Sequence, residues 1–406
     1  MRRGSWWLLV GLMLLLSGVA RHSLLLLMTL LLALVGGASL LWTRYCLAGV
    51  SYQRRFSSSR LFLGEETDLY LEIVNAKPLP LAWLRAVDDF PAEVDLLVGE
   101  LYHAPVPRRR LLVNILSLRW YERVTRRYRL RGVCRGAWQF GPAWIAAGDI
   151  FGFSVRRKAL EETHTVVVYP KIVPLTALGL PRWHPFGDSR TPRRSVTDPL
   201  RLIGAREYVP GDSFRHIHWK ATARRRTLQT KVFEPSASQP LALFLNIRTS
   251  ESITEGLDRA LQEFAITAVA SIARWAWDEG YPVGLFANST VERGGERIRI
   301  RPSSRPEQFH QILEALARVE PLGPWTIAKV LQVEASTLRY GTTVVVVTPT
   351  VSHRLRRTLV DLHRREYGVV LVALGQARLD APLPGVQYHH LGDREAWYAL
   401  ESLALA

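Results

Sequence analysis

One short segment, residues 206–234, gathers most of the side chains in this sequence whose types and spacing could do chemistry. Asp212 lies within it, and His216 and His218 follow in the next six residues. A carboxylate and imidazoles are common acid–base groups, and His-x-His in a strand places both rings on one face, as a metal site needs. Zinc requires a third and usually a fourth ligand, and no obvious set lies nearby. Catalysis and metal binding therefore remain alternatives.

The same segment has a structural explanation. The Pro-Gly pair at 210–211 fixes a turn, because proline presets φ and glycine accepts positive φ. Asp212 is then expected to bond nearby backbone N–H groups and to pair with Arg206 or Arg215, while Trp219 packs against the domain that follows. The sequence predicts this structural corner first, and an interaction surface on the same corner second. The chain holds no Gly-x-Ser-x-Gly elbow and no Walker A loop.

Composition restricts the class of protein. The 406 residues suggest two or three domains. The net charge of +17 suggests an anionic partner, namely a membrane face, nucleic acid or an acidic protein. Near a membrane, anionic lipid accounts for basic residues more simply than nucleic acid does, so nucleic acid is the less favoured partner. Two cysteines, Cys46 and Cys134, make a disulfide framework improbable and fit a reducing compartment.

The N-terminus is apolar. Residues 6–20 and 24–42 form two apolar runs separated by three polar residues, which predicts a transmembrane helical hairpin over residues 1–47. Arginines precede the first run and follow the second, so the positive-inside rule places both ends, and the soluble domains, in the cytoplasm at the cell inner membrane. A cleaved signal peptide followed by a single anchor is the competing interpretation.

The soluble part divides by pattern. Residues 48–172 show short strands punctuated by Gly and Pro, which indicates a β-sandwich. Residues 173–238 form a basic connector, poor in periodic structure, that carries the 206–234 segment. From residue 239 to 406, apolar strands alternate with helices, which predicts a parallel sheet covered on both faces. Ligands of such sheets bind beyond the carboxyl ends of the strands, here Asn246 to Glu251, Asn288-Ser289, Thr348 to Val351 and Gly375.

The order of these parts and the central segment resemble the domain-of-unknown-function 58 family, whose pattern is Arg-x-Tyr-x-x-Gly-Asp-x-x-Arg-x-Ile-x-Trp. The resemblance covers most of the chain and implies a C-terminal von Willebrand factor A-like (Rossmann-like) α/β domain in a multidomain membrane protein. It also implies work beside a MoxR-type AAA ATPase. The positions expected to form the motif and its interaction surface are Arg206, Tyr208, Pro210, Gly211, Asp212, Arg215, Ile217, Trp219, Lys220, Ala223, Arg224, Lys231 and Glu234.

The expected metal site of a von Willebrand A domain is degenerate here. That fold places Asp-x-Ser-x-Ser after its first strand, and this chain has Asn246, Arg248 and Ser250 at the three positions. A divalent cation prefers several oxygen ligands with carboxylate charge, and a guanidinium repels it. We therefore expect no metal and no cofactor, and an arginine that can itself bind a partner carboxylate.

These observations predict a membrane-anchored scaffold without enzymatic activity, which assists assembly or maturation of a partner complex together with the ATPase. The alternative is an envelope-associated hydrolase that uses Asp212 and His218. The sequence identifies neither the client nor the oligomeric state.

Overall fold

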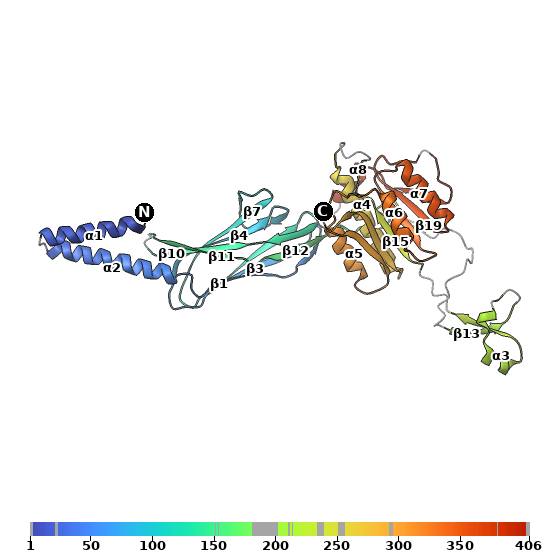
Figure 1. Ribbon diagram of the computed structural model, residues 1–406, viewed down its shortest axis with the longest axis horizontal. Coiled ribbons are helices and arrows are strands. Elements are labelled where there is room, and N and C mark those ends of the chain that lie inside the picture. The colour runs from blue at the N-terminus through green and yellow to red at the C-terminus, as the bar shows by residue number, and fades with distance from the viewer. Residues whose placement is uncertain are drawn as a thin grey trace. The chain divides into compact units, whose positions relative to one another are not determined.

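The computed structural model describes residues 3–20, 23–150, 152, 154–180, 202–209, 212, 214–233, 239–250, 256–291, 295–379 and 381–402. The chain divides into one unit from Met1 to Pro170 and a second from Lys171 to Ala404, and each is described by itself (Figure 1).

Two apolar helices begin the first unit. Helix α1 (Arg3–Ala20) and helix α2 (Ser23–Tyr45) lie side by side (Figure 1). Among the described residues, α2 is the helix that is long and apolar enough to cross a membrane, and a signal sequence near an N-terminus has the same properties. Its 23 residues span about 34 Å at 1.5 Å per residue. A membrane span formed by α1 is not shown, so the two-span hairpin stays a prediction.

The C-terminal end of α2 runs directly into a β-rich region. Cys46 is fully buried in that region's core, and its Sγ contacts the Ala147 carbonyl oxygen at 3.6 Å. Arg156 donates to the carbonyl oxygen of Arg44 at 2.5 Å. The helix and the β-rich region are therefore joined by side-chain contacts as well as by the chain.

The β-rich region contains three sheets. Their strand orders are β1-β3-β8-β5, β11-β10-β4-β7-β6 and β2-β12-β9. The strands are β1 (Val50–Phe56), β2 (Arg60–Phe62), β3 (Glu66–Asn75), β4 (Leu81–Pro91), β5 (Val94–Leu96), β6 (Leu101–His103), β7 (Arg109–Leu118), β8 (Arg123–Gly132), β9 (Gly136–Phe140), β10 (Ala143–Gly148), β11 (Val155–Leu160) and β12 (His164–Tyr169). In β3, buried residues alternate with more exposed ones, so one face contributes to a core shared by all three sheets. The predicted β-rich character of this region is confirmed.

A buried ion pair lies in this core. Arg54 donates to Asp88 Oδ1 at 2.7 Å, and the Tyr52 hydroxyl donates to Asp88 Oδ2 at 2.7 Å. The Arg54 and Asp88 side chains are 2% and 1% exposed. Burial raises the pKa of Asp88 to about 6, because loss of hydration opposes the charge more than Arg54 and Tyr52 support it. This carboxylate therefore makes the stability of the region depend on pH.

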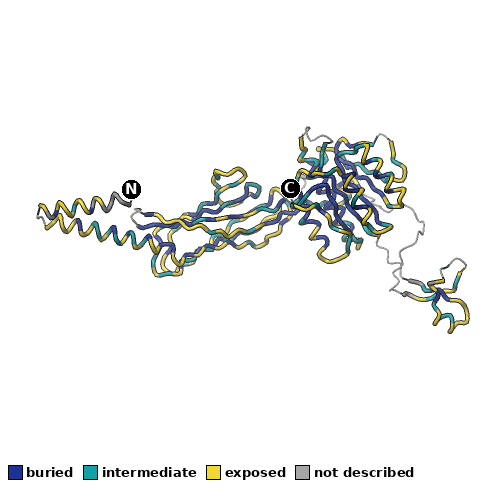
Figure 2. The backbone as a smooth tube through the Cα atoms, in the orientation of Figure 1, coloured by how far each residue is buried: buried dark blue, intermediate teal, exposed yellow. Residues whose placement is uncertain are grey.

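The second unit holds a two-stranded and a six-stranded sheet. The six-stranded sheet has the order β17-β16-β15-β18-β19-β20, and its pairs are parallel except β16–β17. Its elements are β15 (Leu241–Leu245), α4 (Arg259–Asp278), β16 (Val283–Thr290), β17 (Arg297–Ser303), α5 (Gln308–Ala317), α6 (Ile327–Ala335), β18 (Thr343–Thr348), α7 (His353–Arg364), β19 (Gly368–Ala373), β20 (Val386–His390) and α8 (Arg394–Ser402). Residues of β15 and β18 are wholly buried, as continuous apolar strands covered on both faces must be (Figure 2).

The structure corrects two expectations for this sheet. The sheet is mixed rather than parallel, because β17 pairs antiparallel with β16 at one edge. Strand β17 alternates arginine with isoleucine and proline instead of forming an apolar run. The sequence pattern therefore did not predict it as a strand of this sheet. Helix α6 and the edge strand β20 were also not predicted.

The predicted connector 173–238 is not irregular throughout. Residues 202–233 form a small module made of β13 (Leu202–Glu207), the 3₁₀ turn η1 (Phe214–His216), α3 (Trp219–Arg225) and β14 (Gln229–Phe233). Strands β13 and β14 pair antiparallel. We call residues 202–233 the signature module.

Candidate functional site

Asp212 organises the turn of the signature module. Its Oδ1 accepts a hydrogen bond from Arg206 at 2.7 Å, and its Oδ2 accepts from the Val209 N–H at 3.1 Å and the Thr230 hydroxyl at 3.2 Å. These bonds hold the pKa of Asp212 below its ordinary value, with the Arg206 bond as the largest cause. The predicted pairing with Arg206 is thus present, and the carboxylate is ionised and fully used in the turn.

The two histidines do not lie on a strand, so the expected His-x-His face is wrong. His216 ends η1, and His218 is the N-cap of α3. The Nδ1 of His218 accepts a hydrogen bond from the Ala221 N–H at 3.2 Å, which satisfies one of the unpaired N–H groups of the first helical turn. His218 is therefore a capping residue in this structure.

The module has a small buried centre and an exposed aromatic surface. Ile217 is 3% exposed and bridges to Thr230, whereas Phe214 and Trp219 are 72% and 70% exposed. Tyr208 stacks on Phe214 with ring centroids 5.8 Å apart. The expected packing of Trp219 against the following domain is not observed. Large exposed apolar side chains on one small module are a feature of interaction sites.

The module is also rich in cations. Residues 202–233 contain seven Lys or Arg and two acids. Lys220, Ala223 and Arg224 are exposed on α3, and Lys231 is half-buried on β14. Pro210, Gly211 and Glu234 lie outside the described residues, and the side chain of Arg215 does too. The module therefore combines the exposed aromatic side chains Phe214 and Trp219 with a net positive charge.

A second candidate region is the carboxyl edge of the six-stranded sheet, where Asn246 is the centre of an amide network. Its Nδ2 donates to the hydroxyls of Thr348 and Thr350 at 2.9 and 3.2 Å. Its Oδ1 accepts from Asn288 Nδ2 at 2.8 Å and from the Arg248 N–H at 3.2 Å. Asn246 is 3% exposed, and Asn288 and Thr348 are fully buried. The structure thus brings these predicted edge residues together as neutral, mutually bonded groups.

The chain itself covers this edge with residues 320–325. Gln262 donates to the Pro321 carbonyl oxygen at 2.9 Å, and Asn288 donates to that of Trp325 at 3.2 Å. Gly323 lies so close that a Cβ there would meet the Asn288 carbonyl oxygen at 1.6 Å, so only glycine fits. The place where ligands of such sheets usually bind is therefore occupied by protein.

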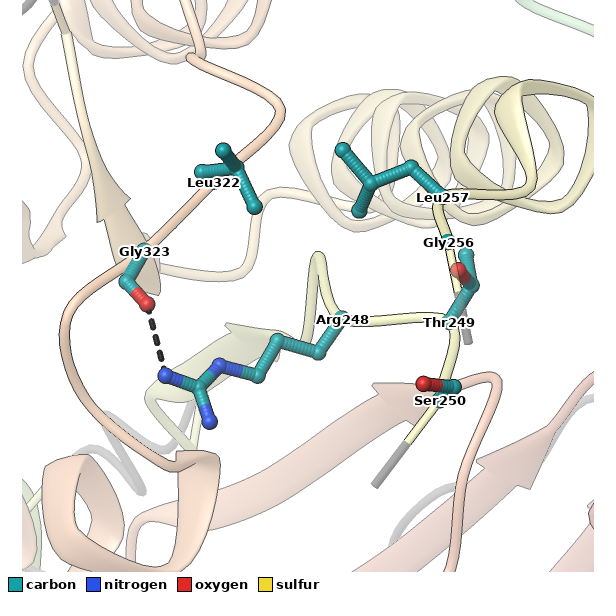
Figure 3. Close-up of a pocket in the computed structure, with 7 residues that line it drawn as sticks. All are labelled: Arg248, Thr249, Ser250, Gly256, Leu257, Leu322 and Gly323. Atoms are coloured by element: carbon teal, nitrogen blue, oxygen red, sulfur yellow. Dashed lines mark hydrogen bonds between the residues drawn. The ribbon is translucent and has the colours of Figure 1, made fainter. Parts of the chain in front are cut away.

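Arg248 lies in a small hollow at the same edge. One of its N–H groups donates to the Gly323 carbonyl oxygen at 2.8 Å, and Figure 3 shows the side chain extending toward it. The hollow has a volume of about 40 Å³, far below the ~300 Å³ at which ordinary ligand sites begin. Ser250 lines it as well. No group of three His, Cys, Asp or Glu side chains able to hold a metal occurs among the residues that the structure describes.

Several residues of these sites were missed from the sequence. Phe214 has no signal that separates an exposed aromatic from a core one, because the burial of an aromatic depends on the tertiary fold. Gln262 and the 320–325 segment join the edge from helix and loop positions far away in the sequence. Asn288 and Thr348 were located at the edge by their places at strand ends, although their mutual bonds were not.

Comparison with known families finds a match for most of the second unit. Residues 204–401 match the family described as "Protein of unknown function DUF58". Just under half of the chain is therefore similar to this family. The DUF58 region includes the signature module from residue 204 and the whole six-stranded sheet. This similarity carries no activity with it.

One relative is an "Uncharacterized protein YeaD" of Bacillus subtilis (strain 168), which is 26% identical over 275 residues. The alignment covers 67% of this chain and 63% of that protein, so less than two thirds of the relative is spanned. Among solved structures, a cohesin module from a Clostridium perfringens family 33 glycoside hydrolase is 14% identical with a TM-score of 0.19, covering 30% of this chain and 95% of that one. A β-glucosidase from Listeria innocua is 13% identical with a TM-score of 0.18, covering 29% and 16%. Scores this low support no argument.

Proposed function

We propose that this protein is a membrane-anchored scaffold without enzymatic activity, and that its signature module docks a partner protein. The partner implied by the family resemblance is a MoxR-type AAA ATPase, which the scaffold assists in the assembly or maturation of a further complex. No cofactor takes part. The observation that carries the proposal is the exposure of Phe214 and Trp219 on a module whose turn is held by the hydrogen bonds of Asp212.

The rigidity of that turn supports binding rather than chemistry. Asp212 is bonded to Arg206, Val209 and Thr230, and the Nδ1 of His218 caps α3, so both side chains have a structural role in the module. A fixed backbone that presents aromatic rings loses little conformational entropy on binding, which is the property of an interface anchor. The surrounding cations suit an acidic face on the partner.

The amide network supports the same conclusion for the six-stranded sheet. We interpret this sheet and its helices as a von Willebrand A-like domain in which Asn246 and Arg248 replace the oxygen ligands of a cation. The neighbouring asparagine and threonine side chains are neutral and bonded to one another, so they supply no charge for a divalent ion. Arg248 remains a proposed contact for a carboxylate of the partner.

For the anchor, we propose that α1 and α2 form a two-span hairpin with both ends in the cytoplasm. Leucines of both helices are highly exposed, for example Leu8 at 76% and Leu24 at 68%, and lipid would cover them. The β-rich region is proposed as a sandwich between this anchor and the DUF58 region. These proposals place the signature module in the cytoplasm, where an ATP-dependent partner works.

The proposal is tested with the full chain in detergent and a purified MoxR-type ATPase held in its ATP-bound state. We expect Trp219→Ala to lower the amount of ATPase retained at least tenfold. Aromatic residues at the hot spots of interfaces commonly contribute about 2 kcal/mol or more of binding free energy. Trp120→Ala is the matched control, because Trp120 is 68% exposed in the β-rich region. Equal retention by both variants, or no retention by the wild type, would refute docking through the module.

A further inference from the structure

One end of the β-rich region adjoins α2, and the proposed function does not use the surface there. Helix α2 ends at Tyr45, and Cys46 and Leu47 are already buried in the core of the β-rich region. Trp42, in the last turn of α2, packs against the same core, and α2 lies against β10 and β11 (Figure 1). The end of the β-rich region therefore reaches the level of the last helical turn.

Strand register brings two further segments to this end. Val50, the first residue of β1, pairs with Asn75, the last residue of β3, and the Asn75 N–H donates to the Glu122 carbonyl oxygen at 2.9 Å. The segment 76–80 and the turn 119–122 continue from these positions. Both therefore lie beyond the strand ends, on the side where α2 enters.

The turn between β10 and β11 lies at the same end. The Cys46 Sγ contacts the Ala147 carbonyl oxygen at the end of β10, and Arg156, near the start of β11, donates to the carbonyl oxygen of Arg44. We call the helix-proximal end the surface formed by segments 46–49, 76–80 and 119–122 and by the turn between β10 and β11.

A buried asparagine fixes the turn between β7 and β8. Asn75 is fully buried, and its Nδ2 donates to the carbonyl oxygens of Leu79 and Arg119 at 3.0 and 2.8 Å. The Tyr121 N–H donates to the Lys77 carbonyl oxygen at 3.2 Å. Tyr121 has a φ of 52°, in the left-handed region that is uncommon for a residue other than glycine. The turn therefore has a defined conformation and keeps a tyrosine where glycine would fit more easily.

The helix-proximal end presents apolar surface to the exterior. Trp120 and Tyr121 are 68% and 69% exposed, and Ile150, in the turn between β10 and β11, is 61% exposed. Tyr45, at the end of α2, is 50% exposed. Single exposed apolar residues are common, but these come from separate parts of the sequence and gather where an apolar helix enters. Tryptophan and tyrosine are enriched at the interface between membrane and water.

Cations accompany this apolar surface. Arg44, Arg119 and Arg156 are exposed, and Lys77 is half-buried. Glu122 is a half-buried acid of the same end, and its carboxylate accepts a hydrogen bond from the Arg119 backbone N–H at 2.5 Å. Arginine and lysine side chains near a membrane surface attract anionic lipid headgroups.

The length of α2 places the helix-proximal end at the level of the headgroups. The apolar residues 24–42 span about 29 Å at 1.5 Å per residue, which matches the ~30 Å hydrocarbon core of a bilayer. Tyr45 lies about 4.5 Å further along, within a headgroup layer that is about 5–8 Å deep on each side. Because the β-rich core begins at Cys46, its end meets the headgroups when α2 spans the bilayer.

We propose that the helix-proximal end is a lipid-binding surface, which inserts Trp120, Tyr121 and Ile150 into the interfacial layer of the membrane and contacts anionic phospholipid headgroups through its arginines. This inference rests on the proposed membrane anchor and adds a second contact to it. A partner protein suits this end less well, because α2 brings the same residues against the bilayer.

The test uses the full chain with Cys134→Ser, because Cys134 is exposed and Cys46 is buried. A fluorophore is attached to a single introduced cysteine, Trp120→Cys or Ile150→Cys. The chain is reconstituted in vesicles of phosphatidylcholine and phosphatidylglycerol, some of which carry a nitroxide quencher at the headgroup or on the upper acyl chain. We expect the nitroxide lipids to quench both labels strongly, because both positions lie in the interfacial layer.

The matched position is Tyr102→Cys. Tyr102 is 52% exposed and pairs with Leu111, which lies about 23 Å along β7 from Leu118 at 3.3 Å per residue. Since Leu118 leads into the turn that carries Trp120, a label at position 102 is far from the helix-proximal end. Quenching by nitroxide lipids should be at least threefold stronger at positions 120 and 150 than at 102.

A charge variant tests the aromatic side chains themselves. In the Ile150→Cys chain, Trp120→Glu/Tyr121→Glu should weaken lipid quenching of the label at least twofold, because carboxylates withdraw this end from the interface. Tyr102→Glu/Val106→Glu adds the same charge at exposed positions away from α2 and should leave quenching unchanged. In chains without an introduced cysteine, an unreactive Cys46 thiol shows that the junction with α2 is still folded.

A label in α2 separates this inference from the proposed anchor. Leu34→Cys is 67% exposed in the middle of the helix and should be quenched by acyl-chain nitroxides if α2 spans the bilayer. Quenching at position 34 with quenching at 120 and 150 no stronger than at 102 would overturn this inference and leave the anchor standing. Absence of quenching at position 34 would overturn both. Equal quenching of the 150 label in the two double-glutamate variants would show that Trp120 and Tyr121 do not make the lipid contact.

Discussion

Replacing Asn246 with alanine tests whether the carboxyl edge of the sheet is held by its own amide network. The side chain makes four hydrogen bonds, two as donor and two as acceptor. Alanine leaves one Asn288 N–H and the Arg248 backbone N–H without partners, while Thr348 and Thr350 still bond each other. Each unsatisfied buried donor costs about 1–3 kcal/mol, and the Arg248 N–H is only partly buried, so we expect a loss of about 2–4 kcal/mol.

Hydrogen–deuterium exchange is the appropriate assay, because a multidomain chain does not unfold in two states. At about 1.4 kcal/mol per factor of ten, the expected loss speeds opening of the β15 and β18 amides by about 30- to 1,000-fold. Asn288→Ala should give a similar value. The double variant should lose at least about 1 kcal/mol less than the sum of the two, because both substitutions remove the same bond.

The control is Gln332→Ala, whose side chain makes one long hydrogen bond of 3.4 Å to Thr358. It should change opening by less than about 0.5 kcal/mol. A loss below that figure for Asn246→Ala would show that the network contributes nothing, and full additivity with Asn288→Ala would show that the two amides act separately.

Three other predictions follow from the geometry. Magnesium at 5 mM or less should leave exchange at residues 241–248 unchanged, as measured against calcium and EDTA. Between pH 4 and 6 the folded chain keeps the Asp88 proton that the unfolded chain releases, so stability should fall as pH rises through this interval, by about 3 kcal/mol relative to Asp88→Asn, and stay level above it. Hydrogen exchange of residues 50–56 and 81–91 in both proteins measures this difference. Ile217→Ala should destabilise the signature module by about 2–4 kcal/mol and Trp219→Ala by under about 0.5, as seen in exchange of residues 214–232.

Each of these has a contrary outcome. Slower exchange in magnesium alone would show that the edge holds a cation. A stability difference between wild type and Asp88→Asn that rises from pH 4 to 6 would mean that Arg54 and Tyr52 outweigh burial. Similar destabilisation by Ile217→Ala and Trp219→Ala would show that the indole belongs to the fold rather than to a surface.

Patterns that depend on local sequence were sufficient for the coarse fold. The apolar runs that become β15 and β18 are typical of buried strands of an α/β sheet, and Asn246 and Asn288 were located at its edge by their places at strand ends. The short strands punctuated by Gly and Pro indicated the β-rich region in the same way.

Features that depend on long-range packing were not accessible. The Arg54–Asp88 pair joins residues that are 34 positions apart in the sequence. The residues next to Arg54 and Asp88 in the sequence give no pattern that predicts the burial of both side chains. Trp219 was expected inside the protein because large aromatics usually are, and its exposure depends on what the module packs against. The histidine spacing was misread because a cap and a 3₁₀ turn replace the strand that the His-x-His argument needs.

The junction between α2 and the β-rich region has a mechanical consequence. Cys46 is buried in the core of the β-rich region, and Arg156 donates a hydrogen bond to the last turn of α2. No flexible linker therefore separates α2 from the β-rich region. A force applied to the β-rich region is therefore transmitted directly to α2, and a rotation of the β-rich region rotates α2 with it. If α2 is embedded in lipid, a force on the β-rich region acts directly on a membrane-anchored helix.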